Sequence, residues 1–381
     1  MGIRIIGHLP TAGDARRFLD HTQTAVNVGV GFRRSAVRTG PSYRAPTLDY
    51  LTEAAMAWER AGAAAALVPT GTSFEDAWVV ASALMARTRR IGFLVALRPG
   101  LVTPVLAAQM MSSFQRLSGG RLLLNVTPGV PGPVSHRFGD WLSKTERLEQ
   151  AGEFLTIVRG AWGEEPFDFT GTHFRVKGAS VTAPDPPPTV YYGGSSEESM
   201  AFAARYADVY LSFAEPPDMV TERIARVHQL AAVHSRTVRY ALSFQIIARE
   251  TAQEAWTVAE KMIGGADEAT IRESLAAFRR SGAANATART RLLDRMASVS
   301  GATEISPNLW VGGLLVHAGR PPALVGSHAE IAERIAEYHE LGVTELQVTG
   351  FPDVEESAHF GEGVMPLLRR NGLLDEWDPL S

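Results

Sequence analysis

The chain has 381 residues, of which 45% are hydrophobic and 20% charged, a composition that excludes whole-chain disorder, a collagen-like repeat and a coiled coil. Its length suits two or three domains, or one α/β barrel with insertions. With 37 basic and 41 acidic residues the net charge is -4, so no global basic field would attract nucleic acid or an anionic membrane.

The absence of cysteine excludes disulfides, thiolate nucleophiles and cysteine-ligated metals. The ten histidines show no H-E-x-x-H or comparable spacing, so we predict no metal site. No run of about 18 apolar residues marks a membrane span, and the first ten residues lack the pattern of a secretory signal. These features predict a cytoplasmic protein.

The N-terminal region predicts a strand, a long loop and a helix. Residues 4–7 form a short apolar run typical of a buried strand. The polar segment 13–46 is too irregular for a helix and predicts a loop or a lid. Helical spacing follows between Thr47, a candidate N-cap, and Gly62. Four arginines of the polar segment could clamp an anionic substrate or remain solvated: Arg33, Arg34, Arg38 and Arg44.

From residue 65 onward, strands and helices alternate regularly. The strands are continuous apolar runs of about four to six residues, as expected for parallel strands buried on both faces. Seven further strands are predicted at residues 65–69, 91–95, 122–126, 189–192, 209–211, 240–248 and 345–349. Helices are predicted at residues 76–86, 104–117, 145–162, 196–206, 218–234, 252–264 and 327–341.

Two segments interrupt this alternation. Residues 167–183 predict an inserted hairpin, and residues 267–324 combine an alanine-rich helical stretch with turn-rich sequence. Eight strands separated by helices favour a (β/α)8 TIM barrel over a doubly wound sheet, which usually stops at about six strands. We therefore predict one domain, 1–381, with insertions at about 13–46, 167–183 and 267–324.

The loops that follow the strands are the expected place of the site in such a barrel. The turn Tyr192-Gly193-Gly194-Ser195-Ser196 directly follows a strand and opens a helix. Its glycines allow close backbone approach, and its hydroxyls and free N–H groups suit a phosphate. A tight turn with a helix N-cap explains the same residues equally well.

Three other strand ends carry polar side chains. Asn125 and Thr127 end the fourth strand, where they could hold a cofactor ring or stabilise a turn. Thr70 belongs to a hydroxyl cluster, 70–76, that is more readily explained as a helix N-cap. His8 ends the first strand and is a candidate acid or base.

Five motifs lie in or near these loops and occur in one order along the chain. They are His8-Leu9-Pro10-Thr11, Val68-Pro69-Thr70-Gly71 with Glu75-Asp76-Ala77-Trp78, Phe93-Leu94-Val95-Ala96-Leu97-Arg98-Pro99, Tyr192 to Ser196, and Ile305-Ser306-Pro307-Asn308-Leu309-Trp310. Together they resemble the alkanesulfonate monooxygenases, which belong to the bacterial luciferase-like, reduced-flavin-dependent monooxygenases. The resemblance extends over about residues 5–368.

This resemblance implies a TIM barrel that uses FMNH2, supplied by a separate NAD(P)H:FMN reductase, and activates O2 as a flavin C4a-peroxide. It also implies a homodimer or homotetramer. The phosphate would bind at the turn after the fifth strand and the isoalloxazine ring near the fourth. The implied cofactor-binding residues are Thr70, Asn125, Thr127, Tyr192, Gly193, Gly194, Ser195 and Ser196.

The chain departs from that family where the family carries sulfonate-binding and proton-handling side chains. Phe74 stands in place of a cysteine and Phe351 in place of a tyrosine. Ser243 and Gln245 replace the arginine and the histidine of an Arg-x-His pair, and a mobile-loop arginine has no counterpart. The charge needed to bind a small sulfonate is thus largely missing, whereas the flavin scaffold is retained.

The leading hypothesis is therefore a two-component flavin monooxygenase acting on an organic substrate other than a simple alkanesulfonate, such as a larger specialised metabolite. Ser243 and Gln245 would orient the substrate by hydrogen bonds, and His8 or His317 would act as acid or base. Four phenylalanines would give the pocket an apolar lining: Phe74, Phe213, Phe244 and Phe351.

Three alternatives remain open at this point. An alkanesulfonate or sulfone oxygenase could take its anion contacts from the arginines of segment 13–46, among them Arg33 and Arg34. The deazaflavin F420 could replace FMN as a hydride carrier. The chain could also be a flavin-binding or ligand-binding protein that has lost catalysis.

Overall fold

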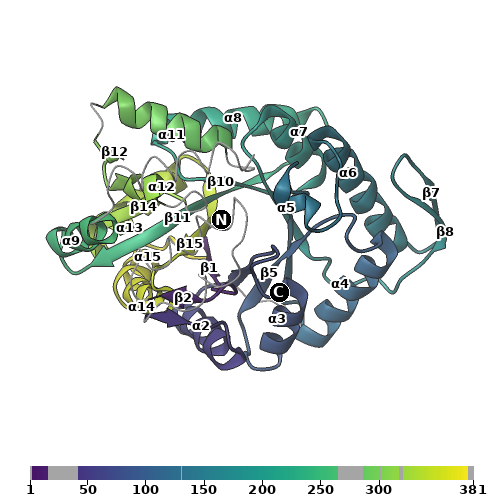
Figure 1. Ribbon diagram of the computed structural model, residues 1–381, viewed down its shortest axis with the longest axis horizontal. Coiled ribbons are helices and arrows are strands. Elements are labelled where there is room, and N and C mark those ends of the chain that lie inside the picture. The colour runs from purple at the N-terminus through teal and green to yellow at the C-terminus, as the bar shows by residue number, and fades with distance from the viewer. Residues whose placement is uncertain are drawn as a thin grey trace.

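The computed structural model describes residues 2–15, 42–129, 131–264, 286–299, 302–316 and 321–375. Eight parallel strands close into a barrel surrounded by helices (Figure 1). In chain order they are β1 (Arg4–His8), β4 (Ala65–Val68), β5 (Gly92–Leu97), β6 (Leu122–Val126), β9 (Thr189–Gly193), β10 (Val209–Phe213), β11 (Arg239–Arg249) and β15 (Val343–Thr349). Each pairs with the next, and β15 pairs with β1. The predicted (β/α)8 TIM barrel is confirmed.

The helices around the barrel begin at side chains that cap them. Thr47, Ser143, Ser196 and Ser327 each accept a hydrogen bond from an N–H of the first turn that follows. The helices are α2 (Leu48–Ala61), α3 (Ala77–Met85), α4 (Pro104–Ser118), α6 (Lys144–Ala161), α7 (Glu197–Tyr206), α8 (Pro217–Ala232) and α13 (His328–Glu340). These helices and the eight barrel strands lie within two residues of their predicted positions.

An apolar layer fills the barrel interior on the N-terminal side of its mouth. Its inward-facing side chains are Ile6, Ala65, Leu67, Leu94, Leu123, Tyr191, Val209, Leu211 and Ala241. Because side chains alternate along a strand, the residues two positions further on face the C-terminal mouth of the barrel. These include His8, Ala96, Asn125, Gly193, Phe213 and Ser243. The filled interior leaves the mouth as the place where a ligand can bind.

Strand β11 is longer than its neighbours and extends beyond the barrel. Its first half pairs with β10 and β15, and its second half pairs with β14 (Ala323–Ser327), a strand that the sequence analysis did not predict. Two short strands, β13 (Leu309–Trp310) and β12 (Glu304–Ser306), continue this edge. Helix α9 (Ala252–Ile263) packs against β14, on the left in Figure 1.

The remaining elements lie in or near the predicted insertions, in the loop between β6 and α6, and at the C-terminus. The predicted hairpin consists of β7 (Phe167–Thr170) and β8 (Arg175–Ala179). It lies outside the ring of helices, on the right in Figure 1. The others are β2 (Asp14–Ala15), β3 (Tyr43–Arg44), α5 (Pro133–His136), α11 (Ala286–Ser298), α12 (Gly312–Val316), α14 (Asp353–His359), a π-helical segment (Phe360–Val364) and α15 (Met365–Arg370). Within the described ranges, no helix has the length and apolar character needed to cross a membrane.

Candidate active site at the mouth of the barrel

The turn between β9 and α7 is shaped for close backbone approach. A Cβ on Gly194 would lie 2.7 Å from Cβ of Ser199, and a Cβ on Gly193 would lie 3.2 Å from the carbonyl oxygen of Leu211. Ser196 caps α7, and its Oγ accepts the Ser199 N–H at 3.3 Å. The turn therefore presents a serine-rich backbone at a helix N-terminus, an arrangement that favours a bound phosphate.

Lys144 adds a cation to this turn. Its Nζ donates to Oγ of Ser196 at 2.8 Å and pairs with a carboxylate oxygen of Glu198 at 2.9 Å. Both charged side chains are exposed, so the pair is weak and Lys144 can turn toward an anion. Fixed glycines, a helix N-terminus, hydroxyls and a lysine are a donor set that fits a terminal phosphate such as that of FMN.

The Tyr192 side chain points away from the barrel mouth. It is buried in the core, its ring centroid lies 4.6 Å from that of Phe202, and its hydroxyl donates to Oγ of Ser199 at 3.3 Å. Burial raises the pKa of Tyr192 to about 12. Since neighbouring residues of a strand face opposite sides, Tyr191 points inward and Tyr192 outward. Only the backbone of Tyr192 is placed to contribute to the turn.

The predicted cofactor residues at the ends of β4 and β6 differ in their surroundings. Asn125 faces the mouth and is almost completely buried. The Thr127 hydroxyl donates to the carbonyl oxygen of Leu97 at 3.1 Å and so holds the ends of β5 and β6 together. Thr70 is half-buried in the loop after β4, and the cap of the following helix is Asp76, which accepts the N–H groups of Trp78 and Val79 at 3.0 Å.

Polar side chains line the wall formed by β11 and β15. Ser243 donates to Oε1 of Gln347, which leaves Nε2 of Gln347 buried and without a hydrogen-bond partner among the described residues. Oγ1 of Thr349 is also buried without a hydrogen-bond partner among these residues. Nε2 of Gln245 contacts Sδ of Met262 at 3.8 Å. Buried polar atoms without partners are rare in native proteins and indicate places that a ligand or water completes.

His8 and Asp353 lie next to this wall. Nδ1 of His8 is 3.4 Å from Oδ1 of Asp353, and the two side chains are 23% and 4% exposed. Neither atom has a hydrogen-bond partner in the part of the chain that the structure describes. The indole N–H of Trp58 donates to the carbonyl oxygen of His8 at 3.0 Å and fixes the end of β1. Acid–base pairs often have such long contacts before a ligand binds.

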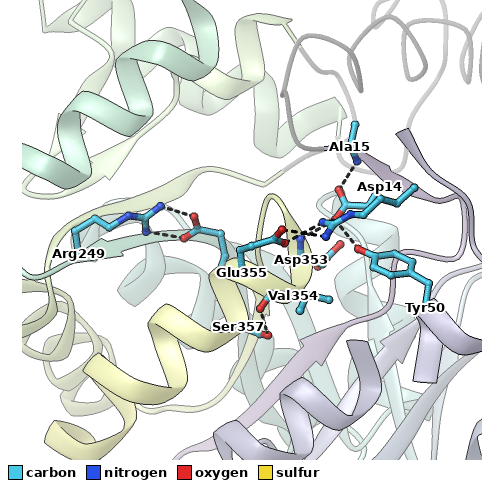
Figure 2. A network of polar contacts seen from close by, with 10 residues as sticks. Asp14, Ala15, Tyr50, Arg249, Asp353, Val354, Glu355 and Ser357 are labelled. Atoms are coloured by element: carbon cyan, nitrogen blue, oxygen red, sulfur yellow. Dashed lines mark hydrogen bonds and ion pairs between the residues drawn. The ribbon is translucent and has the colours of Figure 1, made fainter. Parts of the chain in front are cut away.

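A buried network centred on Asp14 fixes the position of Asp353 (Figure 2). Oδ2 of Asp14 accepts the Asp353 N–H at 2.8 Å, Nη2 of Arg44 at 2.8 Å and the Tyr50 hydroxyl at 2.9 Å. Arg44 also forms a bidentate pair with Glu355 at 3.0 and 2.9 Å. Burial, and next the Asp353 carboxylate, raise the pKa of Asp14. Because two carboxylates hold Arg44, it cannot serve as the predicted clamp for an anionic substrate.

The four predicted pocket phenylalanines do not share one surface. Phe213 faces the mouth beside Ser243 in the strand register. Phe351 packs with Ile247 and other apolar residues of α9, β13 and β14, and Phe74 is half-buried against Gly71. Phe244 is fully buried in the main core, on the opposite face of β11 from Ser243. The prediction that Phe244 lines the pocket is wrong.

The sequence matches the family of luciferase-like monooxygenases over residues 30–345. The chain belongs to this family. It is therefore a flavin-dependent monooxygenase, and the site described above lies at the end of the barrel where such enzymes bind their ligands.

Solved structures share the fold of this monooxygenase at low sequence identity. EDTA monooxygenase from Chelativorans sp. BNC1 is 18% identical with a TM-score of 0.75, covering 100% of this chain and 96% of its own. Riboflavin lyase, solved with modified FMN and riboflavin, is 21% identical with a TM-score of 0.76, covering 99% and 94%. An F420-dependent secondary alcohol dehydrogenase is 15% identical with a TM-score of 0.65, covering 98% and 100%.

Several residues predicted for the monooxygenase site lie outside the described ranges: Arg33, Arg34, Arg38 and His317. Their roles stay predictions. Among the described residues, no group of three or more His, Cys, Asp or Glu side chains could hold a metal ion.

Proposed function

We propose that this monooxygenase uses FMNH2 delivered by a separate NAD(P)H:FMN reductase, with O2 as the second substrate. The turn between β9 and α7 carries the proposal, because Lys144, two hydroxyls and a helix N-terminus suit the dianionic terminal phosphate of FMN. Bound reduced flavin supplies the two electrons with which one oxygen atom of O2 enters the substrate and the other becomes water.

Residues on both sides of the mouth would hold the flavin. Gly193, Gly194, Ser195 and Ser196 would bind the phosphate through backbone and hydroxyl groups, with Lys144 as counter-charge. On the β4 to β6 side, Asn125 faces the mouth and would donate or accept hydrogen bonds at the ring. Thr70 follows the end of β4, and Thr127 directly follows β6.

We propose an organic substrate other than a simple alkanesulfonate. The β11 and β15 wall offers neutral hydrogen-bonding groups in Ser243, Gln245 and Gln347, with Phe213 and Phe351 as apolar neighbours. Neutral amides and hydroxyls orient a polar organic molecule but provide no counter-charge for a sulfonate.

His8 is the proposed acid or base of this wall. Asp353, 3.4 Å from its Nδ1, would orient the imidazole and leave Nε2 free to hold or accept a substrate proton. The hydrogen bond that the backbone N–H of Asp353 donates to Asp14 keeps the Asp353 carboxylate in place.

The proposal can be tested with purified protein, an NAD(P)H:FMN reductase and isotopically labelled O2. We expect one labelled oxygen atom in a product from a panel of polar organic molecules, and no sulfite from alkanesulfonates of any chain length. Sulfite release would overturn the substrate class. Failure of the protein to alter the course of FMNH2 oxidation, with no product, would favour a protein that binds flavin without catalysis. The homodimer or homotetramer suggested by the resemblance can be measured by light scattering.

A further inference from the structure

Arg98 is a cation at the barrel mouth that the fold itself does not use. Strand β5 ends at Leu97, so Arg98 is the first residue beyond its C-terminal end. It continues the alternation of Leu94 and Ala96, whose side chains face the barrel axis. The register places Ala96 beside Asn125, so Arg98 lies one step above the predicted ring-binding residue.

Arg98 is half-buried, and part of its guanidinium lacks a hydrogen-bond partner. Nε and Nη1 are buried and have no hydrogen-bond partner among the described residues. The group is oriented by Phe138, whose ring centroid lies 4.6 Å from Cζ. Gly129 brings the backbone close from the next loop, since a Cβ there would lie 3.5 Å from Cζ and its φ of +85° favours glycine.

The neighbouring Asp140 carboxylate offsets the charge of Arg98 only in part. The adjacent Arg147 takes the Asp140 carboxylate for itself and also donates from Nε to the carbonyl oxygen of Leu142 at 3.1 Å. Burial, and next the charge of Arg147, lower the pKa of Arg98. A guanidinium stays protonated even so, and a buried charge without a counter-ion is costly. The arrangement therefore favours a negatively charged or strongly accepting group from outside the chain at Nε and Nη1.

We propose that Arg98 binds an anionic group of a ligand at the mouth, beside Asn125. The inference rests on the proposed function, because that function places the reaction at this mouth. Two ligands carry the required chemistry. Reduced flavin acquires negative charge at its N1 and C2 carbonyl region, whereas the oxidised ring is neutral. A carboxylate of the organic substrate would present the same acceptor to the guanidinium.

Three variants test this proposal. Arg98→Met removes the charge at similar length, Arg98→Lys keeps the charge without the planar fork, and Arg137→Met removes an exposed arginine from the neighbouring loop as a matched control. One arm measures the Kd values of FMNH2 and FMN by anaerobic titration. A second arm measures the thermal shift caused by acetate and methanesulfonate.

A selective loss of FMNH2 affinity, or a loss of the thermal shift caused by the small anions, supports the proposal. Which of the two is lost identifies the source of the anion. If the anion is reduced flavin, Arg98→Met weakens FMNH2 binding by about tenfold while FMN binding changes little, and Arg98→Lys is intermediate. If the anion belongs to the substrate, FMNH2 binding stays unchanged and the thermal shift by acetate or methanesulfonate is lost in Arg98→Met.

Unchanged binding in both arms would overturn the proposal. We also expect Arg98→Met to keep or raise Tm, because it removes a half-buried charge whose Nε and Nη1 lack hydrogen-bond partners. A fall in Tm by more than about 3 °C with unchanged binding would assign Arg98 to the fold alone. Failure of the unmodified protein to bind any flavin would instead contradict the proposed function. The thermal shifts caused by acetate and methanesulfonate would then show whether Arg98 binds an anion.

Discussion

Individual side chains decide what the mouth of this barrel can bind. On one side, Lys144 and the serines of the β9 to α7 turn are suited to a phosphate, and on the other, Gln347 and Thr349 present unsatisfied buried groups. These sets differ in charge, since one is cationic and the other neutral. The difference supports separate places for cofactor and substrate.

The role of Lys144 can be tested by Lys144→Ala. We expect the Kd values of FMN and FMNH2 to rise by about three- to tenfold, because a charge-assisted contact with the phosphate is lost. Riboflavin, which lacks the phosphate, should bind equally well to both proteins. Lys261→Ala, at another exposed lysine, serves as the control. An equal loss of riboflavin affinity would contradict the assignment.

Gly194 should not tolerate a side chain. A Cβ at this position lies 2.7 Å from Cβ of Ser199, so Gly194→Ala must displace the turn or the start of α7. We expect a loss of about 1 to 3 kcal/mol in the free energy of unfolding, together with weaker FMN binding. Ser199→Gly in the same chain removes the clashing atoms and should restore the binding. Urea unfolding and FMN titration provide both readouts, and unchanged values for Gly194→Ala would refute the close approach.

The ionisation of Asp14 should make stability depend on pH. Its folded pKa lies above the reference value of 3.8, so the folded state holds the proton more tightly than the unfolded state. The resulting stabilisation is fully present below pH 3.8 and is lost as pH rises through the folded pKa. Relative to Asp14→Asn, the natural protein should therefore lose stability as pH rises above about 4 and through the folded pKa of Asp14. A constant difference in urea unfolding across this range would contradict the prediction.

At the scale of elements, the site depends on contacts between segments far apart in the chain. The Asp14 network joins β2 and β3 to α2 and to α14, which follows the last barrel strand (Figure 2). Asp14 and Asp353 are separated by 339 residues, and Lys144 and Ser196 by 52. Such pairs leave no local pattern in the sequence, which explains why sequence reasoning missed them.

Two other predictions that differ from the structure could have been corrected from the sequence, because side chains along a strand alternate between its two faces. Within β11, Ser243 and Gln245 share a face, so Phe244 between them must point to the other side. The same rule separates Tyr191 from Tyr192. Strand β14 was missed for a different reason, because its five residues follow a turn-rich stretch and resemble the end of an insertion.

The Asp14 network predicts unequal effects of removing its two ion pairs. Arg44→Met should lower the free energy of unfolding by about 3 to 5 kcal/mol, because it leaves the buried Asp14 carboxylate without its cation. Glu355→Gln should cost less than about 1 kcal/mol, because the Glu355 side chain is 42% exposed. Combining Arg44→Met with Asp14→Asn should recover part of the loss. Equal effects of the two single variants in urea unfolding would contradict this account.

At the scale of the whole molecule, the barrel could be predicted from the sequence and the site only in part. Continuous apolar runs and capped helices are local patterns, and they located all eight barrel strands. The polarity of the mouth depends on which side chains face inward and which are already paired, and this emerges only when the strands are placed in register. That the whole chain forms a single domain with three insertions stays a prediction.

The most direct measurement of the central claim is an anaerobic equilibrium titration of the protein with FMNH2, FMN and F420H2. The account predicts saturable binding of FMNH2, weaker binding of FMN, and a loss of affinity for both flavins in Lys144→Ala. Tight binding of F420H2 with no binding of FMNH2 would contradict it.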